Sequence, residues 1–289
     1  MSYLDFDEID DLDVLAKLLK MSYSLDDWNK VIELSEKLNQ CSLQQLNEKT
    51  GNQINLKRPL IYYCGYSNLM KSEGLQKIGK YQEALKYIDL YRDMNWYGSM
   101  TPQEAEIAND FKNYAKANTL TIKVLQGDHI ALTEYVDYLK EHPKEILCGL
   151  TNVARAATYY QWDIDNILSS FPNYITNFDS DGDTVKNHYY IDLLYMIALY
   201  RFTRQEYVDA IDYTLLILES ALTLKEHNGY KKSTALFQMF HSKASLQQVN
   251  QYTGLMQSIL EEELRNEKNL IFDGVDIRPG NSSHNANQQ

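Results

Sequence analysis

Prolines at nearly equal spacing are the feature that most limits how this chain can fold. Pro59, Pro102 and Pro143 are separated by 43 and 41 residues, and Pro172 follows after 29. A proline is accepted in the first turn of an α-helix, but it prevents the preceding helix from continuing through it. A spacing near 40 residues matches one long helix-turn-helix repeat. Because only 5 prolines and 12 glycines occur in 289 residues, the intervening stretches are free to form long helices.

The residues between the prolines follow one plan. The stretch 58–78 predicts a helix, Gly79 predicts a turn, and a second helix is expected from Tyr81, with Ala84 and Ile88 on its apolar face. Further pairs of helices are expected from Pro102 to Pro143, from Glu145 to Pro172, over 186–225 and over 229–266, with an additional pair at 7–20 and 25–39.

The organisation predicted from these units is one helical-repeat domain over residues 1–266, built from about five or six hairpins. Residues 267–289 lack periodicity and are expected to form a flexible tail. The loop NFDSDGDT at 177–184 is the expected place for a bend in the stack.

Three turns carry a recognisable motif. The segment GKYQEAL (79–85) resembles the tetratricopeptide repeat, in which glycine permits a tight turn and a small alanine lets two helices approach closely. EYVDAI (206–211) matches without the turn glycine, and QGDHIAL (126–132) keeps the glycine but not the Tyr and Ala. The predicted fold is therefore all-α, a right-handed superhelix of tetratricopeptide-like helical hairpins.

Composition excludes several functions. The formal net charge of −12 and the lack of a basic cluster argue against direct nucleic-acid binding and against docking on anionic lipid. Cys41, Cys64 and Cys148 are far apart and form no CxxC motif, which favours a reducing cytoplasm over a disulfide framework or a zinc site. No apolar window is long enough to span a membrane. No motif of a hydrolase, a zinc enzyme or a phosphate-binding loop occurs, so we expect neither enzymatic activity nor a cofactor.

A longer run carries a second resemblance. KRPLIYYCGYSNLMKS (57–72), GKYQEALKYIDLYRDMNWY (79–97), FKNYAKANTL (111–120) and LTEYVDYLKEHPKEI (132–146) are similar to the C-terminal helical-repeat half of helix-turn-helix transcriptional regulators from Gram-positive bacteria. The resemblance covers about residues 10–225. It implies a sensor and dimerisation domain, which in some relatives binds short signalling peptides in a concave groove.

The start of the chain departs from that pattern, because the sequence opens almost directly on the first repeat helices. We expect either a sensor domain cut from a longer regulator or a form that regulates through a partner. The preferred hypothesis is a module that binds a peptide or a protein segment and can form a homodimer. A constitutive assembly scaffold without ligand and a phosphatase-type regulator of a response regulator are the alternatives.

The candidate binding residues are polar or aromatic side chains on the first helix of each pair, because these helices line the concave surface of stacked hairpins. They are Tyr66, Glu73, Asn113, Asn118, Asn152, Arg155, Tyr159, Asp192 and Tyr195. Amides and guanidinium groups can bond a peptide backbone or carboxylate, and tyrosine rings can stack. Core packing is the competing interpretation for each tyrosine.

Two acidic segments have alternative interpretations. Asp179, Asp181 and Asp183 alternate as calcium ligands do, but the loop lacks the required later glycine and glutamate, which favours a solvated connection. The acidic start, from Asp5 to Asp13, is expected to stabilise the first helix through its dipole and alternatively to dock a basic partner.

Overall fold

The computed structural model describes residues 9–48, 56–176, 178–180 and 182–266, and within these residues it holds helices and no β-strand. The predicted all-α class is confirmed. The tail predicted at 267–289 lies outside the described residues, as do Asp5, Asp7 and Asp181. None of the described helices is both long enough and apolar enough to cross a membrane.

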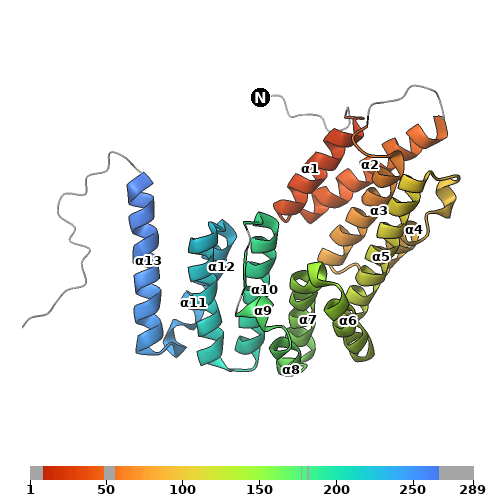
Figure 1. The fold of residues 1–289 in the computed structure, drawn as a ribbon. Helices are drawn as coiled ribbons and strands as arrows, with labels where there is room; N and C mark the ends of the chain where they lie inside the picture. Colours follow the sequence, from red (N-terminus) through yellow and green to blue (C-terminus); the bar gives the residue numbers. More distant parts are fainter. Residues whose placement is uncertain (1–8, 49–55, 177, 181, 267–289) are drawn as a thin grey trace, which may run out of the picture.

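The described residues form thirteen α-helices, most of them packed against the next. Figure 1 shows their order along the chain. They are α1 (Leu12–Ser24), α2 (Trp28–Glu48), α3 (Leu60–Lys77), α4 (Tyr81–Arg92), α5 (Pro102–Leu125), α6 (His129–Glu141), α7 (Ile146–Tyr160), α8 (Asp165–Ser169), α9 (Pro172–Ile175), α10 (Thr184–Thr203), α11 (Tyr207–Leu224), α12 (His227–Phe240) and α13 (Leu246–Asn266) in the described part of the chain.

Side-chain caps set several helix starts. Thr101 Oγ1 accepts from the Glu104 amide at 3.3 Å and the Thr101 amide donates to Glu104 Oε2 at 2.9 Å, which forms a capping box at the start of α5. The first two helices begin later than the predicted 7–20 and 25–39. The reason at α1 is Asp11, whose carboxylate accepts from the amides of Asp13 and Val14 and so fixes the first turn there.

The loop before α10 is also closed by a cap. Asp183 Oδ1 accepts from the Val185 and Lys186 amides at 2.9 and 3.2 Å, and Lys186 Nζ donates to the Asp179 carbonyl at 2.7 Å. Asp183 therefore serves the helix start. In the described residues no group of three His, Cys, Asp or Glu side chains could hold a metal ion.

One turn geometry recurs along the described chain. A residue with positive φ stands two places before α2, α4, α6, α11 and α12, namely Asp26 (57°), Gly79 (78°), Gly127 (92°), Gln205 (63°) and Lys225 (55°). In each case the following amide donates to the carbonyl five positions earlier, at 2.8 to 3.1 Å, which is the Schellman closure of a helix end. The turn at 204–207, where the motif glycine is missing, thus keeps the glycine conformation with a glutamine.

We predict that Gln205→Gly raises the free energy of unfolding by about 0.5–1 kcal/mol, because the left-handed conformation costs a residue with a Cβ atom about 1–2 kcal/mol and the greater freedom of glycine in the unfolded chain offsets part of that gain. The matched control is Gln126→Gly, since Gln126 ends α5 with a φ of −88° and needs no glycine. That substitution should lower stability. Urea unfolding of both variants measures the difference, and equal changes at the two positions would contradict the prediction.

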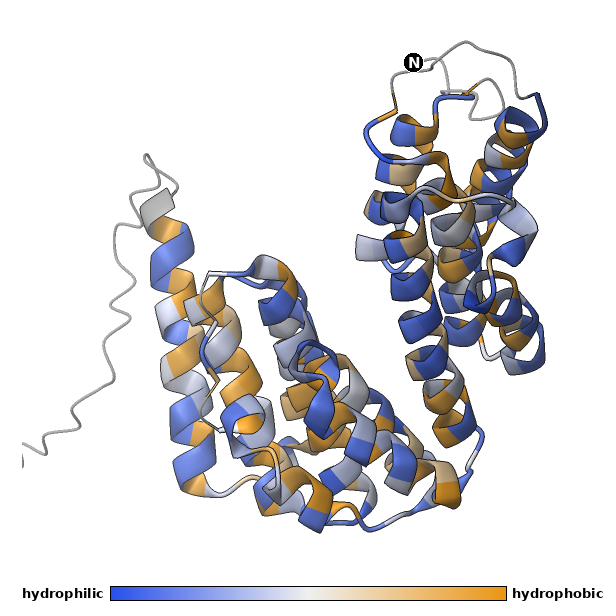
Figure 2. Cartoon of the chain, turned by 45° about the vertical axis from the view of Figure 1, so that its right-hand side comes forward, coloured by the Kyte–Doolittle hydropathy of each residue, from blue (hydrophilic) through white to orange (hydrophobic). Residues whose placement is uncertain are grey.

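The buried apolar side chains form two clusters that meet on α5. Phe111 and Ala115 belong to the cluster built by α1 to α5, whereas Leu120 and Val124 belong to the cluster that continues through α11 and α12. Figure 2 shows the two groups of helices diverging from this shared region. Helix α5 is therefore the element that couples the two halves of the described chain.

The bend predicted at 177–184 is wrong in position. Helices α7 and α10 on the two sides of that loop pack together and contribute to the same core cluster. Ala154 and Ala157 on α7 are almost fully buried in this shared core cluster. The loop therefore runs beside a continuous core, and the change in direction falls at α5.

Candidate ligand-binding site

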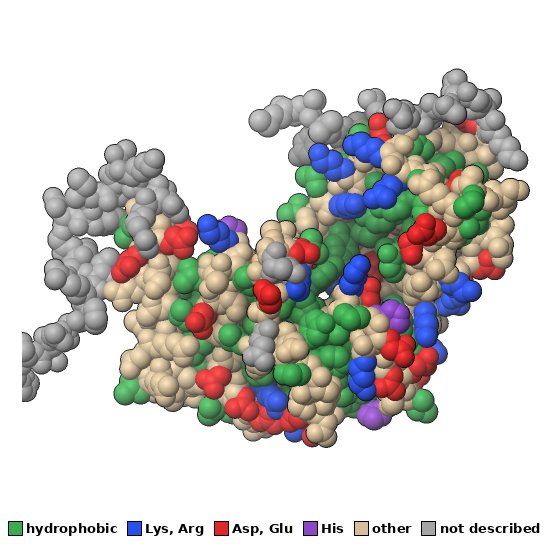
Figure 3. All heavy atoms as spheres, in the orientation of Figure 1, with side chains coloured by type: hydrophobic (Ala, Val, Ile, Leu, Met, Phe, Trp, Pro, Cys, Tyr) green, Lys and Arg blue, Asp and Glu red, His purple; other side chains and the backbone are tan. Residues whose placement is uncertain are grey.

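A cavity of 680 Å³ opens on the face between the two groups of helices, where Figure 3 shows a hollow with hydrophobic side chains inside it and basic side chains along its border. Its size falls in the range of small-ligand sites. The lining comes from α1, the segment before α3, α3, α5, the start of α7, and α10, and comprises Lys20, Tyr23, Arg58, Tyr62, Tyr66, Leu69, Met70, Glu73, Ile107, Asp110, Phe111, Tyr114, Ala117, Asn118, Lys144, Glu145, Cys148 and Tyr189.

Helical periodicity explains the largest part of this lining. On α3, Tyr62, Tyr66 and Glu73 lie four and then seven residues apart, so they share one face of the helix. On α5, Phe111 and Asn118 are separated by seven residues and face α3 in the same way. These are the first helices of their pairs, which is the side that the sequence predicted to be concave.

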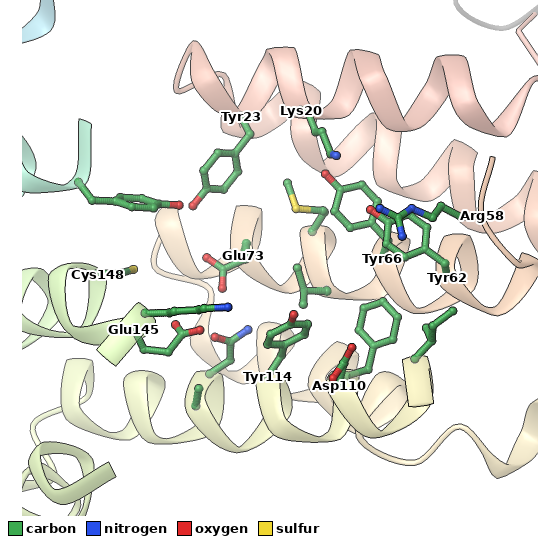
Figure 4. A pocket seen from close by; sticks show the side chains of 18 residues that line it. Lys20, Tyr23, Arg58, Tyr62, Tyr66, Glu73, Asp110, Tyr114, Glu145 and Cys148 are labelled. Atoms are coloured by element: carbon green, nitrogen blue, oxygen red, sulfur yellow. The ribbon is translucent and has the colours of Figure 1, made fainter. Parts of the chain in front are cut away.

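One end of the cavity joins aromatic rings to basic groups. The rings of Tyr62 and Tyr66 are stacked, with centroids 5.4 Å apart and planes inclined by 10°. Arg58 Cζ lies 5.7 Å from the Tyr62 ring centre and Lys20 Nζ lies 5.8 Å from that of Tyr66. Figure 4 shows these four side chains together. We call this the cationic end; it presents two positive charges held over aromatic faces.

The other end is acidic. Burial raises the pKa of Glu73, although Lys77 opposes the shift and the nearby carboxylate of Glu145 adds to it. Burial likewise raises the pKa of Glu145, and it raises the pKa of the Cys148 thiol to about 11. The thiol is therefore protonated at neutral pH and is a poor nucleophile. Glu73, Glu145 and Cys148 form the acidic end of the cavity (Figure 4).

A pair of tyrosines links the two halves of the molecule beside the acidic end. Tyr23 on α1 and Tyr189 on α10 both line the cavity and lie close to each other, and burial raises the pKa of both. Tyr23 is held from behind by the edge of Trp28, at 5.3 Å between ring centroids. The two residues are far apart in sequence and belong to different halves of the described chain. A change in the angle between the halves would therefore change the distance between them.

Some of the predicted binding residues line the cavity. Tyr66, Glu73 and Asn118 do so, and Asn152 lies beside Glu73 and Asn118 in an adjoining side pocket of 30 Å³. The two amides are partly engaged by the protein itself, because Asn118 Nδ2 donates to the Tyr91 hydroxyl at 2.9 Å and Asn152 Nδ2 contacts Cys148 Sγ at 3.9 Å.

Five of the predicted residues lie outside the cavity. Asn113 is exposed because it sits two positions after Phe111, about 200° around α5. Arg155 and Tyr159 continue the face of α7 that carries Cys148 and Asn152, but they lie nearer the end of that helix.

The remaining two, Asp192 and Tyr195, face α12. Asp192 is paired with Lys232, whose Nζ also lies 5.3 Å from the centre of the Tyr195 ring. The reason is that α12 packs on α11 and α10 at this point, so this face of α10 is covered.

Several lining residues were not predicted. Tyr62 could have been found from Tyr66, because the two are spaced by four residues and a helix places such positions in one row. Arg58 lies before the start of α3, so helical spacing does not place it. Lys20, Tyr189 and Glu145 carry no such signal, since they reach the cavity from other helices.

Comparison of the chain with protein-family models, curated proteins and solved structures finds no match in any of the three.

A histidine on α10 lies between a carboxylate of its own helix and the carboxylate that caps α12. His188 Nδ1 lies 3.3 Å from Glu226, the N-cap of α12, and Nε2 lies 3.6 Å from Asp192. The hydrogen bond to Glu226 raises the pKa of His188, with Asp192 adding to the shift while burial and Lys232 oppose it. Burial alone would raise the pKa of Glu226, but His188 and the Gly229 amide hold it below its usual value.

We predict that His188 stabilises the fold by about 1 kcal/mol or less at pH 6 and that this contribution disappears in alkaline solution. A group with a raised folded pKa contributes fully below its usual value of 6.5 and loses the contribution as pH rises through the raised value. Thermal unfolding of His188→Gln should therefore differ from that of the parent chain at pH 6 and agree with it at pH 9. His241→Gln, at an exposed position, is the control; a difference for His188→Gln that does not vary with pH would contradict the prediction.

Proposed function

We propose that this chain is a tetratricopeptide-like sensor module that binds a short peptide, or an exposed segment of a partner protein, in the cavity on its concave face. The observation that carries the proposal is the 680 Å³ cavity, lined by stacked aromatic rings and charged groups on side chains from the two groups of helices, with Lys20 from α1, Glu73 from α3 and Glu145 before α7. Aromatic rings with a few convergent polar groups are the usual lining of ligand sites. The recurring helix-end turn and the GKYQEAL segment support the repeat interpretation.

The second part of the proposal is that binding changes the angle between the two halves. The cavity is shared by both core clusters, and α5 belongs to both of them. A ligand that contacts α3 and α7 at once favours one inter-half angle and shifts the population toward it. Tyr23 and Tyr189 lie close to each other across the same opening. In a regulatory setting, that shift would be passed to a partner protein or to a second copy of the chain.

Retention of peptides by the full chain tests the proposal. A mixed library of peptides of 3 to about 12 residues, with free and blocked ends, is equilibrated by dialysis and the retained peptides are identified by mass spectrometry. Leu69→Trp, which places a large ring in the cavity, should abolish retention. Leu90→Trp is the matched control, because Leu90 is an exposed leucine on α4 outside the lining.

Failure of the parent chain to retain any peptide would refute the proposal and favour an assembly scaffold without ligand. Small-angle scattering tests the second part. The radius of gyration should change on addition of a retained peptide in the parent chain and in Leu90→Trp, and stay constant in Leu69→Trp. An unchanged radius with bound peptide would refute the shift between halves.

A further inference from the structure

The charged groups inside the cavity lack partners of opposite charge. Within the described residues Glu73 makes no hydrogen bond and no ion pair, and the Glu145 carboxylate makes none either. Among the described residues Lys20 and Arg58 have no carboxylate within 4.0 Å; both are exposed to solvent and lie over tyrosine rings. Glu73 and Glu145 are half-buried, and a buried charge without a partner is costly unless a ligand supplies one. Both ends of the cavity are therefore prepared for a charged group, and the two ends have opposite sign.

The other charged groups nearby do not cancel this arrangement. Lys77 is the cation that lowers the pKa of Glu73. Its Nζ lies 5.2 Å from the centre of the Trp28 ring, and it forms no ion pair among the described residues. Asp110 and Lys144 complete the lining; like Lys20 and Arg58 they are exposed to solvent, and neither forms an ion pair among the described residues. The recessed carboxylate of Glu73 is thus left for a ligand, with Glu145 beside it.

Helix α3 sets the distance between the two ends. Tyr66 and Tyr62 precede Glu73 by 7 and 11 residues on the same helix face. With a rise of 1.5 Å per residue these separations are about 10 and 16 Å. An extended peptide covers about 3.3–3.6 Å per residue, so about three to five residues span the interval.

We propose that the ligand is a peptide of three to five residues with both termini free, lying along α3 with its amino group at Glu73 and Glu145 and its carboxylate at Lys20 and Arg58. This inference rests on the proposed function and specifies the ligand of that site. Leu69, Met70 and Phe111 line the wall between the two ends, so apolar side chains fit the middle of the peptide. The reverse direction places like charges together at both ends, which disfavours it.

Tetrapeptide libraries with defined ends test the inference. The full parent chain is dialysed against a mixed tetrapeptide library with free termini, against the same library N-acetylated, and against the same library C-amidated. Loss of one charge-assisted contact should reduce retention roughly 10- to 100-fold in each blocked library. Equal retention of free and blocked tetrapeptides would overturn the inference while leaving peptide binding by the cavity intact. Retention of no peptide in any library, including the longer ones, would overturn the proposed function as well.

Variants that remove a charge from one end of the cavity test the direction in which the peptide lies along α3. Glu73→Gln should reduce the difference between free and acetylated peptides, since only Glu145 then remains for the amino group, and should keep the difference between free and amidated ones. The double variant Lys20→Met with Arg58→Met should do the opposite. Glu134→Gln and Lys112→Met remove exposed charges outside the lining and should keep both differences. If Glu73→Gln instead removes the effect of amidation, the proposed direction is wrong. The comparison of free and blocked libraries uses the parent chain alone, so it tests the need for free termini even where a variant fails to fold.

Discussion

Phe111→Ala is expected to lower the free energy of unfolding by about 3–5 kcal/mol, the usual cost of removing a buried aromatic ring. Phe111 is only 3% exposed. Its ring contacts those of Tyr62, Tyr91 and Tyr114, with centroids 6.1 to 6.3 Å apart, and so ties α3, α4 and α5 together. Because the cavity already lies on one side of this ring, the space left by the substitution would merge with it instead of closing.

Urea unfolding measures this loss. Tyr159→Ala is the control for removal of an aromatic side chain, because Tyr159 is 79% exposed and its replacement should change stability by about 0.5 kcal/mol or less. A loss below about 1 kcal/mol for Phe111→Ala would show that the ring does not hold α3 against α5.

Gly65→Ala is expected to lower stability by about 1–3 kcal/mol, although alanine is the better helix former. A Cβ atom at residue 65 would lie 2.3 Å from Phe111 Cε2, and the buried ring has little room to move. The glycine is therefore what allows the Phe111 ring to lie against the backbone of α3.

Gly254→Ala is the matched control, since a Cβ atom there meets nothing within 4 Å and the substitution should raise stability by about 0.5–1 kcal/mol. A double variant sharpens the test. Once Phe111→Ala has removed the ring, adding Gly65→Ala should no longer destabilise, because the two residues are in direct contact and their effects are not additive. A full additive loss in the double variant would contradict the steric explanation.

Local sequence determined the helices and their turns. The helix break at Gly79 and the placement of Pro102 and Pro172 in first turns follow from interactions within a few residues, and the structure has them where the pattern predicts. The EYVDAI segment also located the turn at Gln205 correctly, although the motif glycine is missing. The helix-end hydrogen bonds form there with a glutamine in the place of the glycine. Periodicity likewise placed Tyr66 and Glu73 on the face of α3 that lines the cavity.

Only the tertiary structure decided which helix faces meet. The angle at α5 brings Lys20 and Tyr23 from α1, and Tyr189 from α10, to the same cavity. It also leaves Asp192 and Tyr195 against α12, although their position on the first helix of a pair predicted the concave face. Helical periodicity fixes the direction of a side chain around its own axis. The packing of small residues such as Gly65 fixes how closely neighbouring helices approach, and therefore which of those side chains share a site.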